Sequence, residues 1–173
     1  MIITARLLPV SAALAASLAL SACATPPPPL TLVQTKATVQ LLRNETATRI
    51  PAKMIAVVEN TSDLSQECDA GDPIRHWESS ALVAITAEGA PHTRNIFRDL
   101  VNNYVGDGWK EGNVGDRQAV LTNDNSMAKV DILMVDDADG DGEGASLRVV
   151  VTGPCVATAG ADSEEVVRLE TQE

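Results

Sequence analysis

The chain has 173 residues, of which 24 are acidic and 13 are basic, so its net charge is −11 at pH 7. No run of Lys or Arg is present, which argues against nucleic acid as a partner and against membrane contact through basic side chains. The aromatic residues are two Trp, one Tyr and one Phe, so we expect an aliphatic core and no aromatic platform for sugars or single strands.

The N-terminal segment is typical of the leader of an exported protein. Arg6 precedes an apolar run over residues 7–20, which is shorter than the roughly 20 apolar residues that a membrane-spanning helix needs. The next motif, Leu20-Ser21-Ala22-Cys23, resembles a bacterial lipobox, in which the cysteine is lipidated and becomes the first mature residue. The resemblance implies a signal peptide over residues 1–22 and two or three acyl chains on Cys23, which dissociate slowly from a membrane.

A lipidated Cys23 predicts attachment to the extracytoplasmic face of the cell membrane. The next residue is Ala24 rather than Asp, so in a two-membrane cell the outer membrane is also an allowed destination. An ordinary cleaved signal peptide and an uncleaved anchor are the alternatives. Loss of the leader changes the net charge to −12, because Arg6 is its one charged side chain. Four prolines follow in residues 23–35, which we expect to form a lipidated N-terminus and a stiff linker.

Residues 36–157 show the patterns of a single globular domain. A helix is predicted over residues 36–49, where apolar residues recur at near-helical spacing, and Pro51 ends it. Strands are predicted over residues 53–60 and 75–87, and the polar segment 61–73 between them is predicted to be a loop.

The most regular helical pattern follows Pro91. Thr93 is expected to cap this helix, apolar side chains form a stripe over residues 96–104, and Gly106-Asp107-Gly108 ends it. The remaining predicted strands are short, alternate in polarity and span residues 118–122, 130–134 and 147–151.

This order of elements predicts an α+β fold. We expect two helices packed on one face of a mostly antiparallel sheet of about five strands, with one disulfide. Residues 158–173 are acidic and poor in core-forming side chains, so they are predicted to be a flexible tail.

Two cysteines, Cys68 and Cys155, remain once Cys23 is assigned to lipidation. In an oxidising compartment they form one intramolecular pair, which makes a Cys68–Cys155 disulfide the expected arrangement. A free buried thiol and an intermolecular bridge are the alternatives. A metal site is not expected at these cysteines, because neither His76 nor His92 stands at a metal-ligand spacing from them.

The order of these elements over residues 36–155 resembles small actinobacterial lipoproteins of the LppA-like kind. The positions that carry the resemblance are Cys68, Gly108, Trp109, Gly153 and Cys155. It implies a lipobox followed by a globular α+β domain. All five positions have structural roles, so the resemblance supplies no catalytic residue.

An aspartate-rich segment, residues 137–142, matches the first half of a calcium loop. Asp137, Asp139 and Asp141 supply carboxylates at positions 1, 3 and 5, and a glycine stands at position 6. The twelfth position holds Arg148 instead of a bidentate Glu, and the flanks read as strands, which excludes an EF-hand. A looser calcium site and a solvated hairpin turn are the two interpretations, and the turn is preferred.

One strand carries side chains that recur in hydrolases, namely His76, Glu78 and Ser80. No Gly-x-Ser-x-Gly motif accompanies them, so an exposed polar strand face is the preferred interpretation. The sequence therefore predicts a non-catalytic binding or accessory lipoprotein without a cofactor. Its partners would be the membrane, through its lipid, and an envelope protein or small ligand. A calcium-dependent module is the first alternative and an envelope hydrolase the second.

Overall fold

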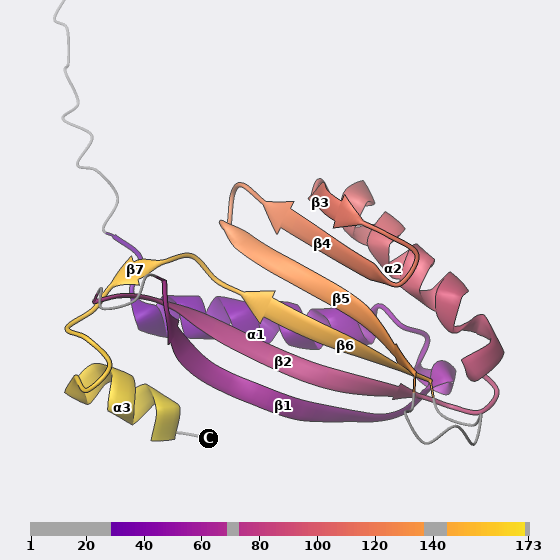
Figure 1. Ribbon diagram of the computed structural model, residues 1–173, viewed down its shortest axis with the longest axis horizontal. Coiled ribbons are helices and arrows are strands. Elements are labelled where there is room, and N and C mark those ends of the chain that lie inside the picture. The colour runs from indigo at the N-terminus through magenta and orange to yellow at the C-terminus, as the bar shows by residue number, and fades with distance from the viewer. Residues whose placement is uncertain (1–28, 69–72, 137–144, 172–173) are drawn as a thin grey trace, which may run out of the picture.

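The computed structural model describes residues 29–68, 73–136 and 145–171. Their centre is a seven-stranded antiparallel sheet, in which β3 to β6 form a meander and β6 returns to pair with β2 (Figure 1). The order is β1-β2-β6-β5-β4-β3, and β7 pairs with the start of β2. The strands are β1 Ile55–Glu67, β2 Ile74–Ile85, β3 Lys110–Val114, β4 Gln118–Asn123, β5 Ala128–Asp136, β6 Ala145–Thr152 and β7 Val156–Ala157.

The core lies on one face of this sheet. Side chains alternate between the two faces of a strand, and directly paired residues share a face. Trp77, Val83 and Leu147, for example, are fully buried on the covered face. We call the other face, which carries alternate β2 residues from His76 to Ala84, the open face.

Helix α1 (Leu32–Thr48) covers β2 and β6 and lies behind the sheet in Figure 1. A capping box between Thr31 and Gln34 begins the helix, so it starts inside the segment predicted to be linker. Val39 is fully buried against the sheet. The helix ends before Pro51, as predicted.

Helix α2 (Thr93–Gly106) packs on the β4–β6 side of the same core, and its buried stripe is the predicted one. Thr93 is its first helical residue rather than its cap, and the short 3-10 turn η2 (Ala90–His92) precedes it. Tyr104 is fully buried, contacts Trp109 edge to face and shares a hydrogen bond with Thr46 of α1. These contacts join the two helices at one end of the sheet.

Residues 61–67, the first part of the polar segment predicted to be a loop, are strand instead. Strand β1 continues through them to Glu67, and Ser65 is buried opposite Trp77. Charged and hydroxyl residues occupy this half of the strand because hydrogen bonds satisfy them: Asp63 accepts one from the Trp77 indole, and Arg75 donates to Ser65. The polarity reflects buried side-chain partners rather than an irregular backbone.

The predicted flexible tail, residues 158–173, contains a helix over half of its length. Residues Glu164–Thr171 form helix α3, whose Val166 and Leu169 are buried in the core. The ammonium of Lys36 donates to the Leu169 carbonyl over 2.6 Å, and Ser65 donates to Glu170. Val166 and Leu169 stand three positions apart and therefore lie on the same face of this short amphipathic helix.

The α+β class and the antiparallel sheet agree with the sequence prediction. The described residues contain three α-helices and seven strands, compared with the expected two and about five. The strands that the prediction lacks are β3, which is exposed throughout, and the two-residue β7.

Candidate functional site

Four of the predicted site residues, Cys23, Asp137, Asp139 and Asp141, lie outside the described residues. Lipidation and calcium binding therefore stay predictions. Among the residues that the structure describes, none of the helices has the length and apolar character needed to cross a bilayer.

The disulfide between Cys68 and Cys155 is present, which confirms the predicted pairing. Cys68 directly follows β1, and Cys155 stands between β6 and β7, so the bridge connects the edge strand to the end of the meander. His76 lies beside the bridge, with its Nδ1 atom 3.5 Å from the Cys68 Sγ. We call these three residues the Cys–His cluster.

The cluster corrects the sequence analysis, which found no histidine at a metal-ligand spacing. The ligand atoms of Cys68, His76 and Cys155 all lie within 4.8 Å of one another. The missed signal is the hairpin: Gln66 pairs with His76, so a residue just past β1 meets the start of β2. Burial lowers the pKa of His76 below its usual 6.5, and the nearby Glu78 carboxylate opposes that shift.

The hydrolase-like residues of β2 do not form a catalytic arrangement. His76 and Ser80 share the open face but stand four positions apart on an extended strand, which separates them by roughly 13 Å. The Ser80 hydroxyl is buried and pairs with Thr61. The neighbouring Ser79 faces the core and accepts a hydrogen bond from Arg43 over 2.6 Å. Nucleophilic catalysis requires a nucleophile and a base in contact, and these side chains do not provide such a pair.

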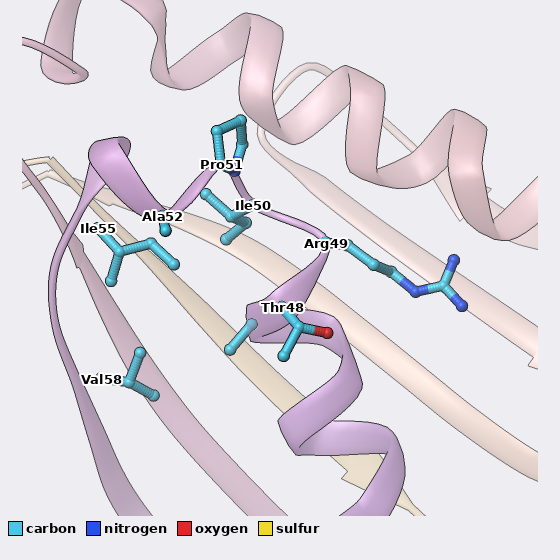
Figure 2. Close-up of a pocket in the computed structure, with 8 residues that line it drawn as sticks. Thr48, Arg49, Ile50, Pro51, Ala52, Ile55 and Val58 are labelled. Atoms are coloured by element: carbon cyan, nitrogen blue, oxygen red, sulfur yellow. The ribbon is translucent and has the colours of Figure 1, made fainter.

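A mainly apolar hollow of the described surface lies where α1 ends beside β1 (Figure 2). Helix α1 covers β2 and β6 but not the first half of β1, so Val58 stays 42% exposed on the covered face. The hollow has a volume of about 500 Å³ and is shallow and open to solvent. We call it the α1–β1 groove, and its lining residues are Ala47, Thr48, Arg49, Ile50, Pro51, Ala52, Ile55 and Val58.

The single charged residue of this lining is directed out of the groove. Figure 2 shows Arg49 pointing away from Ile55 and Val58. Its guanidinium lies 4.5 Å over the Tyr104 ring and 2.6 Å from a carboxylate oxygen of Asp107. Both contacts hold the cation on α2, and the groove presents mainly apolar side chains.

A more polar hollow of about 360 Å³ adjoins the groove and shares Arg49 and Pro51 with it. Its other side is α2, which contributes Asp99, Asn102 and Asn103. The two hollows together offer an apolar surface with carboxylate and amide groups at one end. That arrangement suits a partner that presents an apolar side chain beside hydrogen-bond donors.

Comparisons with known proteins give no relative from which to transfer a function. No family model, no curated protein and no solved structure matches the chain. The resemblance to LppA-like lipoproteins stays a prediction, and the function must be argued from the geometry.

Proposed function

We propose that this chain is a lipid-anchored, non-catalytic binding module of the cell envelope. Cys23 attaches it to the extracytoplasmic face of the membrane, and the α1–β1 groove receives an apolar side chain of a protein partner. The observation that carries the proposal is the uncovered apolar strip of β1, with Val58 exposed beside Ile50 and Ile55.

The shape of the groove favours a protein partner over a small ligand. Small-molecule sites enclose most of the surface of their ligand, whereas this groove is shallow and open on one side. Protein interfaces are built around apolar anchors that enter such hollows, with polar contacts at the rim. The amide and carboxylate groups of α2 supply that rim.

The direction of α1 is consistent with this role. The lipid would be attached at Cys23, nine positions before Leu32, the first residue of α1. The helix has 17 residues and is therefore about 25 Å long, and the groove lies at its far end (Figure 1). A domain anchored through Cys23 would thus present the groove away from the bilayer, within reach of other envelope proteins.

Two neighbouring valines provide the experiment. Val57 and Val58 are 46% and 42% exposed but face opposite sides of β1, because Val57 pairs with Ala84 and Val58 with Val83. A photo-crosslinking amino acid is introduced at each position of the full chain in its native membrane. We expect one discrete protein adduct from position 58 and none from position 57, and an Ile55→Asp substitution should abolish it. Equal adducts from both positions, or none from either, would contradict the groove as the binding site.

The anchor is tested separately. Cys23→Ser should release the chain from the membrane fraction, and persistent membrane association with unchanged processing would refute lipidation. The adduct at position 58 and the membrane partition report on different parts of the proposal.

A further inference from the structure

The Cys–His cluster carries a second inference, which is independent of the groove. We propose that reduction of the Cys68–Cys155 disulfide creates a binding site for a soft metal cation of the Zn²⁺ class. The ligands are the two thiolates and the Nδ1 atom of His76, with water in the fourth position.

The spacing of the donors supports this set. Zinc ligated at about 2.3 Å by sulfur and about 2.0 Å by nitrogen in a tetrahedron requires these atoms to be roughly 3.6 Å apart. The observed distance from Cys68 Sγ to His76 Nδ1 is 3.5 Å. The Cα atoms of the two cysteines are 6.3 Å apart, so rotation of their side chains can separate the sulfurs without a backbone shift.

Backbone pairing with β2 holds all three ligands, so their arrangement does not depend on the disulfide alone. The Cys68 N–H donates to the Ile74 carbonyl over 3.0 Å, and His76 is part of β2 itself. Cys155 directly precedes Val156, which pairs with Arg75. These contacts persist when the sulfur–sulfur bond is broken, and they keep the site organised for a metal.

The exposure of these three residues also suits a metal ligand set. Cys155 is exposed while Cys68 and His76 are half-buried, so a reductant and a cation can both reach the sulfurs. Imidazole and thiolate together are the donor set that zinc prefers in proteins.

The redox step is balanced by a dithiol reductant. The dithiol gives two electrons and two protons to the disulfide, which becomes two thiols, and the dithiol becomes a cyclic or protein disulfide. The cation then displaces the two thiol protons as it binds. Reoxidation by a disulfide, which takes up two electrons and two protons and becomes a dithiol, rejoins the Cys68 and Cys155 sulfurs and releases the metal.

Cobalt is the probe for the test, because thiolate-bound Co²⁺ has a charge-transfer absorption in the near ultraviolet. The full chain carries Cys23→Ser, so that Cys68 and Cys155 are its remaining cysteines. It is reduced with a phosphine and titrated with Co²⁺. We expect one Co²⁺ per chain with thiolate absorption, displacement by Zn²⁺, and no absorption before reduction.

Two histidine variants identify the third ligand. His76→Ala should weaken Co²⁺ binding by at least about tenfold. His92→Ala, which alters an exposed histidine away from the cluster, should leave it unchanged. Absence of the absorption in the reduced chain, or equal binding by both variants, would overturn the proposal. Circular dichroism accompanies each titration, and a reduced chain that is unfolded and stays so with metal would also overturn it.

Discussion

Gly153, which directly follows β6, lies against Thr35 and Val39 of α1, and Gly153→Ala tests this packing. A Cβ atom at residue 153 would lie 2.3 Å from the Thr35 Cγ2 atom and 2.9 Å from the Val39 Cγ2 atom. The backbone cannot move away freely, because the Gly153 N–H donates to the Trp77 carbonyl over 2.9 Å. The added methyl group must therefore displace the Thr35 and Val39 side chains or push α1 away from residue 153.

Overpacking of this kind costs about 1–3 kcal/mol of unfolding free energy. Urea denaturation followed by circular dichroism measures it. Gly106→Ala is the matched control, since nothing lies within 4 Å of a Cβ at that helical position. The control should range from neutral to about 1 kcal/mol more stable, because alanine is the better helix former.

A second substitution tests the cause. Thr35→Ser removes the clashing methyl group but keeps the hydroxyl that donates to the Thr31 carbonyl. In the Gly153→Ala background it should recover about 1 kcal/mol, measured as a coupling in a double-mutant cycle. A Gly153→Ala variant as stable as Gly106→Ala, or no recovery with Thr35→Ser, would refute a steric clash between residue 153 and α1.

Three further outcomes are expected. Leu169→Ala should lower the unfolding free energy by about 2–5 kcal/mol and Val167→Ala by less than about 0.5 kcal/mol, because Leu169 is 6% and Val167 48% exposed. Equal urea midpoints for the two variants would contradict a folded α3. Tyr104→Phe should cost about 1 kcal/mol through the lost hydrogen bond to α1. Burial raises the pKa of Tyr104 above 10.0, so the stability from its neutral form is present below pH 10 and is lost as the pH rises through the raised pKa. The Tyr104→Phe variant should therefore lose less stability than the parent chain between pH 9 and pH 11. The same pH profile for both chains would argue against burial of the hydroxyl. Replacing Cys68 and Cys155 by serine opens a crosslink with a sequence separation of 87 and should cost about 4 kcal/mol, with no loss expected if the bridge does not form.

Elements with a strong apolar period were predictable from the sequence. Helix α2 follows from its stripe and its closing glycine, and Gly108 adopts a φ of +86° just beyond it. The covered face of β2 follows from the alternation of Trp77 with polar neighbours. In both cases burial alone dictates the residue pattern.

Elements held by side-chain hydrogen bonds were not predictable in this way. The second half of β1 is predicted to be a loop because Asp63 and Ser65 are polar, and their partners come from β2, α1 and α3. Arg43 is likewise a buried residue of α1, bonded to Ser79, at a position that periodicity assigns to the surface. A single sequence contains no sign of which distant group will satisfy a polar side chain.

The candidate sites also differ in how far the sequence alone predicts them. The disulfide needed only a count of cysteines and an oxidising compartment. His76 joins it because a hairpin aligns β1 with β2, and register depends on bulges near Ile55 and Asn60 that the sequence does not mark. The groove exists because α1 leaves β1 uncovered, which is a matter of helix position rather than of any motif.

Helix α3 returns the chain to where it started, because the Leu169 carbonyl accepts a hydrogen bond from Lys36 in the second turn of α1. A fluorescent reporter fused after residue 171 would consequently emerge near the start of α1, some two nanometres from the groove along that helix. If Cys23 is lipidated as proposed, such a fusion would leave the groove accessible but would place a bulky reporter close to the bilayer. Tagging for microscopy is therefore expected to disturb membrane docking before it disturbs partner binding.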